Sequence, residues 1–244
     1  MSISTRSYAR PYGSRGGLPQ GIQALLIANT ALFLILFFGR QSLNGVFSIL
    51  ALTPARAVGS LYVWQLATFL FIHVSVMGFL FNMLALWMFG KELEEMWGTQ
   101  RFLRFYFLCG SGAGVCVILA QYLFGNPQVS TIGCTPAVYG ILAASAALWP
   151  ERDVIFFFFP MKMKYFVILI AAVDFLLSYD AGVGAIVLLL GGLAIGLLYI
   201  KAPRVRGFDP MASMQSSFRA WKLRRAKRKF QVYLRKHGSD RDIN

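Results

Sequence analysis

The sequence predicts an all-α integral membrane protein, a bundle of six transmembrane helices with both termini in the cytoplasm. Hydrophobic residues make up 57% of the chain and charged residues 14%, so the chain cannot cover itself with water-facing side chains. Apolar segments that approach or exceed the length needed to cross about 30 Å of hydrocarbon as a helix recur along it. We place them at 21–39, 66–89, 102–124, 133–149, 165–178 and 182–200.

The positive charge is divided very unequally between the alternate connections of these segments. Of the 24 Lys and Arg residues, all but Arg40 and Arg56 fall in the N-terminal tail, in 90–104, in 150–164 or in the C-terminal tail. Cytoplasmic flanks retain Lys and Arg, so this division predicts an even number of crossings with the N- and C-termini inside.

Three parts follow one another along the chain. Residues 1–20 are rich in Ser, Gly, Pro and Arg, which predicts a disordered cytoplasmic tail. Residues 21–201 are expected to form the six-helix membrane domain, and the first apolar run is too long for a cleaved signal peptide. The connection at 40–65 is long and apolar, so we expect it to dip into the outer membrane interface.

The third part, 202–244, is a basic cytoplasmic tail. Apolar residues recur in it at helical spacing among Lys and Arg, at Ala220, Leu223, Ala226, Phe230, Tyr233 and Leu234. A basic amphipathic helix beside a cytoplasmic membrane face predicts membrane lipids as partners, anionic lipid above all. Nucleic acid is a weaker candidate partner, because no nucleic-acid-binding motif accompanies the basic run.

The cysteines and small residues are read as packing features. Cys109, Cys116 and Cys134 lie in apolar segments without metal-ligand spacing, so no metal and no cofactor is expected. Small residues form one stripe on the fourth segment through Gly133, Ala137, Gly140 and Ala144, and Gly192 and Gly196 form a GxxxG pair on the sixth. Small residues allow close approach of helices in lipid, so these two helices are predicted to pack together.

Several separated stretches resemble the rhomboid intramembrane serine proteases. They are 64–73 (WQLATFLFIH), 81–87 (FNMLALW), 90–106 with Gly90, Glu94 and Gly98, 133–140 (GCTPAVYG) and 188–196 (LLLGGLAIG). The resemblance covers roughly residues 20–200. It implies a six-helix core with the N-terminus inside, a first loop that dips into the membrane, and a Ser–His dyad on the fourth and sixth helices.

The residues that the resemblance assigns to catalysis are replaced. The nucleophile position is Thr135 and the base position is Leu189. A hydroxyl needs a nearby proton acceptor to act as a nucleophile, and leucine offers none. The family also has a second histidine, which acts with the asparagine at the position of Asn82 to stabilise the oxyanion. At the position of that histidine, this sequence has Gly78. Tyr139 stands where the family packs an aromatic ring against its base, and apolar packing is expected there.

Neither histidine is expected to replace the base. His237 lies in the cytoplasmic tail, and His73 is nine residues before Asn82. Both lie on the predicted second span, where nine steps of about 100° place them on opposite faces of the helix. His73 should therefore point away from Asn82 and serve the first loop or a backbone carbonyl. Thr135 followed by Pro136 is typical of a helix N-cap and first turn. Asp174, near a helix end, is expected to be hydrated.

The sequence therefore favours a rhomboid-like pseudoprotease in a membrane, with the bacterial inner membrane expected. Its partners would be transmembrane helices of client proteins, bound around Gly78, Asn82, Gly133, Thr135, Tyr139 and Leu189. Two alternatives stay open. One is an active intramembrane protease that uses Thr135 or Cys134 with another acceptor, and the other is a membrane scaffold that acts through its basic tail.

Overall fold

The computed structural model describes residues 17–39, 44–156, 159–178 and 182–202. The chain divides into two compact units, Met1–Leu198 and Tyr199–Asn244. Most of the predicted N-terminal tail and almost all of the predicted basic tail lie outside the described residues.

The described part of the chain is mainly helical. In order it contains α1 Gln20–Phe38, α2 Asn44–Leu50, α3 Pro54–Gly59, α4 Gln65–Thr68, the 3-10 helix η1 Phe69–Phe71, α5 Val76–Ala85, the π-helix η2 Leu86–Gly90, α6 Lys91–Trp97, α7 Thr99–Phe124, α8 Thr135–Leu148, β1 Asp153–Phe156, β2 Phe159–Lys162, α9 Met163–Ser178 and α10 Val183–Lys201. Within the described ranges, four helical stretches are long and apolar enough to cross a membrane: Gln20–Phe38, Val76–Trp97, Thr99–Phe124 and Val183–Lys201. Helices α8 and α9 are shorter, at 14 and 16 residues. The protein is therefore an integral membrane protein.

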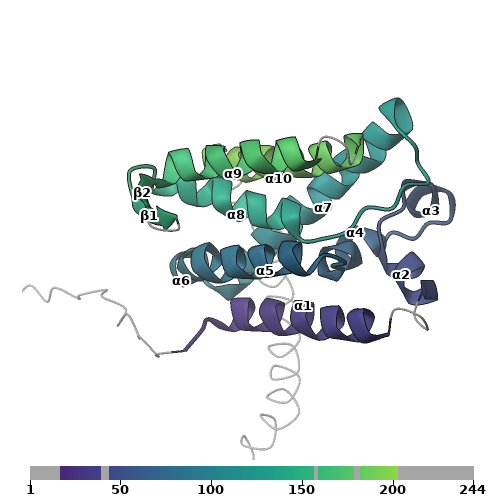
Figure 1. Ribbon diagram of the computed structural model, residues 1–244, viewed down its shortest axis with the longest axis horizontal. Helices are drawn as coiled ribbons and strands as arrows, with labels where there is room; N and C mark the ends of the chain where they lie inside the picture. Colours follow the sequence, from purple (N-terminus) through teal and green to yellow (C-terminus); the bar gives the residue numbers. More distant parts are fainter. Residues whose placement is uncertain (1–16, 40–43, 157–158, 179–181, 203–244) are drawn as a thin grey trace, which may run out of the picture. The chain divides into compact units, whose positions relative to one another are not determined.

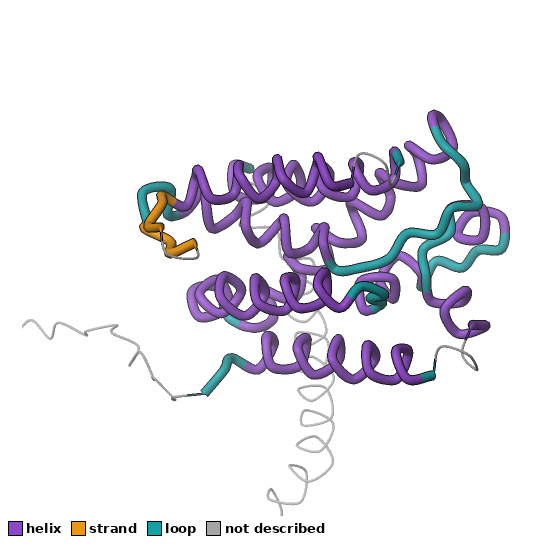
Figure 2. The backbone as a smooth tube through the Cα atoms, viewed as in Figure 1, coloured by secondary structure: helices purple, strands orange, loops and turns teal. Residues whose placement is uncertain are grey.

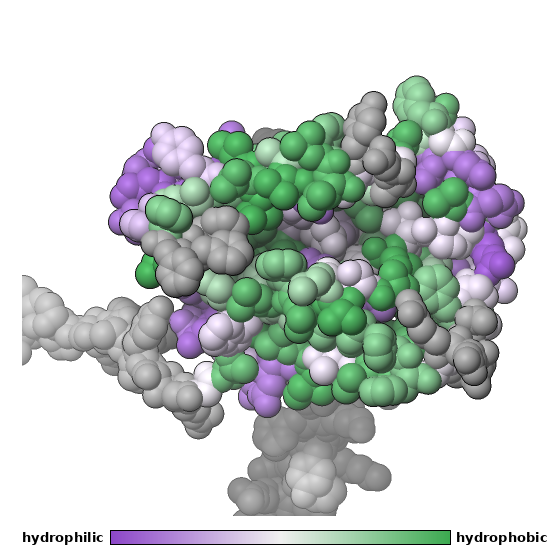
Figure 3. All heavy atoms as spheres, in the orientation of Figure 1, coloured by the Kyte–Doolittle hydropathy of each residue, from purple (hydrophilic) through white to green (hydrophobic). Residues whose placement is uncertain are grey.

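The long helices run side by side, with the connections gathered at the two ends (Figure 1). The β1–β2 hairpin and α6 lie at one end, and the segments 51–64 and 125–134 lie at the other (Figure 2). Polar side chains gather at these two ends and hydrophobic ones cover the middle of the face in Figure 3. This distribution suits a membrane between two aqueous surfaces.

The second apolar segment differs from the prediction of one helix over 66–89. The chain leaves the helical conformation at Ile72–Ser75, and Ser75 begins α5 by accepting a hydrogen bond from the Gly78 amide at 3.3 Å. The helix then continues past residue 89 as far as Trp97. Uniform apolarity concealed the break, since a chain in lipid is apolar on both sides of it.

The connection predicted at 90–104 is correspondingly short. Only Gly98 separates α6 from α7, and its φ of 80° is a conformation that side-chain-bearing residues rarely adopt. Lys91 lies on α6, and Arg101 and Arg104 lie on α7. The charged end therefore consists of helix termini and the hairpin.

Solvent-exposed ion pairs link side chains at that end. Arg152 pairs with Glu92, Lys162 pairs with Asp153 at 2.9 Å, and Lys164 pairs with Glu151 at 2.5 Å. The hydrogen bond from Lys164 lowers the pKa of Glu151 from its ordinary value.

At the other end, the first connection packs on the loop before α8. Leu52 and Thr131 form an antiparallel bridge, with amide-to-carbonyl distances of 3.0 and 2.8 Å. The Gly133 amide donates to the Phe69 carbonyl at 2.9 Å. The start of α8 is thus tied to the first loop and to η1, which fixes the position of Thr135.

Helix α8 lies at the centre of the packing, since every residue from Pro136 to Ser145 is buried. A Cβ at Gly196 would lie 2.7 Å from the Gly140 carbonyl oxygen, and one at Gly192 would collide with the Pro136 carbonyl. At Gly140 a Cβ would lie 2.5 Å from the Cys109 sulfur. Glycine at these positions lets α7 and α10 approach the backbone of α8.

Candidate functional site

Asn82 and Thr135 meet between α5 and α8. The Asn82 side-chain nitrogen donates to the Thr135 hydroxyl oxygen at 3.2 Å, and both side chains are half-buried. Asn82 lies in the middle of an apolar helix, where a polar side chain is costly unless it is paired. This hydrogen bond supplies the pairing.

Thr135 does not cap α8, contrary to the prediction. It is the first residue of the helix, and Cys134 holds the N-cap position without a side-chain hydrogen bond to the helix. The Thr135 hydroxyl is engaged by Asn82, so it does not turn back to the helix amides. Gly133 before it has a φ of +105°, which directs the chain from the loop into α8.

His73 is not on a helix, so the prediction that it points away from Asn82 rested on a wrong premise. It lies in the Ile72–Ser75 break. Its Nε2 accepts a hydrogen bond from the Cys134 backbone N–H at 3.5 Å and lies 3.4 Å from the Cys134 sulfur. The expected partner was the first loop or a backbone carbonyl. The ring does lie near the Phe71 backbone, and its other contacts are with Cys134, the N-cap residue of α8.

A buried polar cluster extends inward from Cys134. The Tyr106 hydroxyl lies near the side chains of Cys134 and Asn29, and all three residues are fully buried. Among the described residues, Asn29 Oδ1, His73 Nδ1 and the Tyr106 hydroxyl make no hydrogen bond of normal geometry. The cluster joins α1, the 72–75 break, α7 and the start of α8.

The other predicted site residues differ in how close they lie to Asn82 and Thr135. Leu189 is 2% exposed and precedes Gly192 by three residues, so it shares the face of α10 that packs on α8. Gly78 lies exposed in the first turn of α5, where its amide is bonded to Ser75. The structure therefore brings Asn82, Gly133 and Thr135 together and leaves Gly78 at the edge.

Tyr139 makes a polar contact that the sequence did not predict. Its hydroxyl donates to Asp174 Oδ2 at 3.0 Å and lies 3.4 Å from the Ile170 carbonyl oxygen, both on α9. Apolar packing was expected for Tyr139 and hydration for Asp174. The available signal was that Tyr139, near the start of its apolar segment, and Asp174, near the end of the next one, should lie at the same end of the bundle. Pairing them also requires knowing how α8 and α9 are rotated about their axes.

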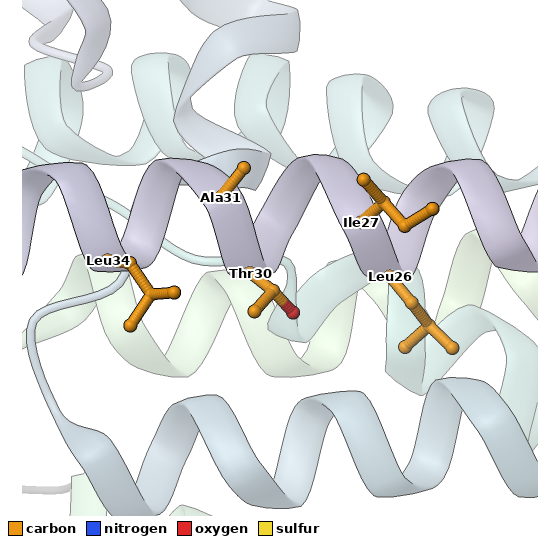
Figure 4. Close-up of a pocket in the computed structure, with 5 residues that line it drawn as sticks. All are labelled: Leu26, Ile27, Thr30, Ala31 and Leu34. Carbon is orange, nitrogen blue, oxygen red and sulfur yellow. The ribbon is translucent and has the colours of Figure 1, made fainter.

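A shallow apolar groove follows α1 along Leu26, Ile27, Thr30, Ala31 and Leu34 (Figure 4). Its lining includes none of the predicted site residues. Within the described ranges, no three His, Cys, Asp or Glu side chains lie close enough together to hold a metal ion.

Comparison with known proteins agrees with the motifs. The Rhomboid domain family matches residues 60–202. Rhomboid-like protein 19 of Arabidopsis thaliana is 26% identical over 159 residues, 62% of this chain and 52% of that protein. Rhomboid protease GluP of Bacillus subtilis is 36% identical over 81 residues, 33% of this chain and 15% of that protein.

Rhomboid-like protease 3 of Toxoplasma gondii is 28% identical over 99 residues, 41% of this chain and 36% of that protein. The chain thus spans about half the length, or less, of these relatives. The family match covers more than half of the chain and includes all of the stretches described above, and the chain belongs to the rhomboid family.

Proposed function

We propose that this chain is a rhomboid pseudoprotease, which binds transmembrane helices of client proteins without cleaving them. In this proposal α1, α5–α6, α7, α8, α9 and α10 all cross the membrane, with both termini in the cytoplasm. The Lys and Arg distribution supports this orientation, because the α6 and hairpin end carries most of the basic residues of the membrane domain.

One observation carries the proposal: the partner of the Thr135 hydroxyl is a carboxamide. Asn82 lies 3.2 Å from it, and an amide accepts no proton at neutral pH in either orientation of its oxygen and nitrogen. Attack by a hydroxyl requires a base that takes its proton as the new bond forms. The Asn82 hydrogen bond therefore positions Thr135 without activating it.

The surroundings of Thr135 support the same interpretation. Leu189, at the position that the resemblance assigns to the base, is apolar and buried. The Cys134 amide is directed at His73, so it is not free to stabilise an oxyanion. Pro136 contributes no amide hydrogen.

A hollow between α9 and α5 is the proposed client-binding surface (Figure 3). The rings of Phe89 and Phe166 join η2 to α9, with centroids 5.6 Å apart, toward the hairpin end. Asn82 and Thr135, bonded across α5 and α8, supply polar groups that a client helix with an exposed backbone or polar side chain can contact.

Photocrosslinking tests this proposal in nanodiscs. A photoreactive residue at position 135 should capture transmembrane segments, and the same residue at the exposed position 123 on α7 serves as the control. Cleavage products should be absent, under conditions in which a rhomboid protease cuts the same substrates. Cleavage that disappears in Thr135→Ala would overturn the proposal.

A second candidate function is proteolysis by Cys134. Its sulfur lies 3.4 Å from His73 Nε2, a thiol–imidazole pair of the kind that nucleophilic catalysis uses. The thiol is fully buried, however, so a substrate reaches it only if the start of α8 moves. This candidate requires Cys134→Ala to abolish cleavage while Cys116→Ala retains it, and thiol-directed probes to label Cys134 in membranes.

The tail and the cellular location are proposed from the sequence. The tail 202–244 would bind anionic lipid at the cytoplasmic face, and the bacterial inner membrane is the proposed compartment. Deleting 215–244 should reduce binding to anionic vesicles and leave client crosslinking at position 135 unchanged. If client capture is lost instead, the scaffold alternative explains the protein better.

A further inference from the structure

The inner face of α9 ends in a carboxyl group. Met163, Phe166 and Val167 are buried on this face, and Ile170 and Asp174 continue it at helical spacing. The first four are apolar, as packing on α8 requires, but the fifth is acidic and only half-buried. Apolar packing alone does not account for Asp174.

Asp174 is only partly satisfied by the protein. Its Oδ2 accepts the Tyr139 hydroxyl at 3.0 Å, and no partner of Oδ1 is recorded among the described residues. The chain itself has no Lys or Arg between Arg104 and Arg152, nor between Lys164 and Lys201. Helices α8 and α9 beyond Lys164 therefore supply no cation, and neither does α10 before Lys201.

The depth of Asp174 follows from its partner. Tyr139 is four residues into α8 from Thr135, a rise of about 6 Å along the helix. Asp174 thus lies about one turn inside the start of α8 and four residues before Ser178, the last residue of α9, which is one of the two helices that border the hollow. An acidic side chain at membrane depth is costly unless it pairs with another group.

We propose that Asp174 selects clients by charge: it pairs with a Lys or Arg located about one turn below the end of a client transmembrane helix. A Lys or Arg at that depth is itself costly in lipid, so the ion pair relieves the cost of placing both the client's cation and the Asp174 carboxylate in the membrane. Tyr139 positions the carboxyl group by holding Oδ2 and leaves Oδ1 for the client. This inference rests on the proposed client binding and names its specificity.

Synthetic helices test this selectivity. The probes are three leucine-rich transmembrane peptides that differ in one residue's identity or position: Lys at the matching depth, Met at the same depth, and Lys moved to the opposite end of the span. Binding to the full chain in neutral-lipid nanodiscs is measured by fluorescence energy transfer. The matched Lys peptide should bind about tenfold more tightly than either other peptide, a difference of about 1.4 kcal/mol.

Variants assign the preference to Asp174. Asp174→Asn should reduce the preference to less than twofold and leave the Met peptide's affinity unchanged. Tyr139→Phe should weaken the preference without abolishing it, since the carboxyl group remains. Asp153→Asn, an exposed acidic residue in β1, should retain it in full.

The outcomes separate this inference from the function on which it rests. Equal binding of all three peptides, with crosslinking from position 135 intact, overturns charge selection and leaves helix binding standing. A preference that survives in Asp174→Asn also overturns it. If none of the peptides binds or crosslinks, the proposed function fails and the inference fails with it.

Discussion

Glu94 is a buried acid whose effect reaches another helix. Its carboxylate accepts hydrogen bonds from the Gly21 and Ile22 amides at 2.8 and 2.7 Å and from the Thr99 hydroxyl at 2.6 Å. Gly21 and Ile22 lie in the first turn of α1, whose amides have no partners within the helix. One side chain on α6 therefore caps α1 and ties it to the start of α7.

We expect Glu94→Ala to destabilise the protein by about 2–4 kcal/mol. Two amides in a buried site would lose their acceptor, at about 1–3 kcal/mol each, and partial relaxation reduces the sum. Unfolding by denaturant in detergent micelles measures the change. Glu95→Ala is the matched control, because Glu95 is exposed and only faces Lys91 at 3.9 Å. Equal stability of the two variants would contradict this role.

At the residue scale, the sequence identified positions better than contacts. The motif assigns Asn82 and Thr135 to one proposed site, and their side chains are in contact. It did not identify the partner of His73, because that depends on a break in the helix, nor the Tyr139–Asp174 bond, because that depends on helix rotation. Contacts between elements follow from packing, which a single sequence does not encode locally.

At the scale of elements, the sequence predicted most helix bounds but not the break within a helix. Most apolar runs gave helices close to their predicted bounds, such as α1 for 21–39 and α10 for 182–200. The prediction of one helix over 66–89 was wrong in two respects. The chain leaves the helical conformation at 72–75, and the helix that follows extends beyond residue 89 into charged residues. Apolarity records immersion in lipid, whereas a break depends on hydrogen bonds such as that between Ser75 and Gly78.

The α8–α10 contact gives a prediction at this scale. In Gly192→Ala the added methyl group meets the Pro136 carbonyl, which is backbone and cannot rotate away. We expect a loss of about 1–3 kcal/mol, the usual cost of overpacking. Thermal unfolding in detergent measures it. Ala194→Val, on an exposed position of the same helix, adds more volume and should have little effect, so a larger loss there would contradict the contact.

For the whole molecule, the number of crossings depends on α8. Its 14 residues extend about 21 Å, less than the roughly 30 Å hydrocarbon core. Length therefore excludes it from the four candidate spans. Helix α8 is, however, buried along most of its length, so it is in contact with protein and not with lipid. A helix enclosed in this way can cross with both of its ends sunk below the membrane surface.

Single cysteines on either side of α8 decide whether it crosses. We expect Gln128→Cys, in the link before α8, to react with a membrane-impermeant maleimide in intact cells, and Asp153→Cys to react only after permeabilisation. Both positions are exposed, and the background carries Cys116→Ala because Cys109 and Cys134 are already buried. Reaction of both from the same side would show that α8 does not cross. Exchange of the two sides would reverse the orientation that the Lys and Arg distribution predicts, because positive charge would then flank the outer face.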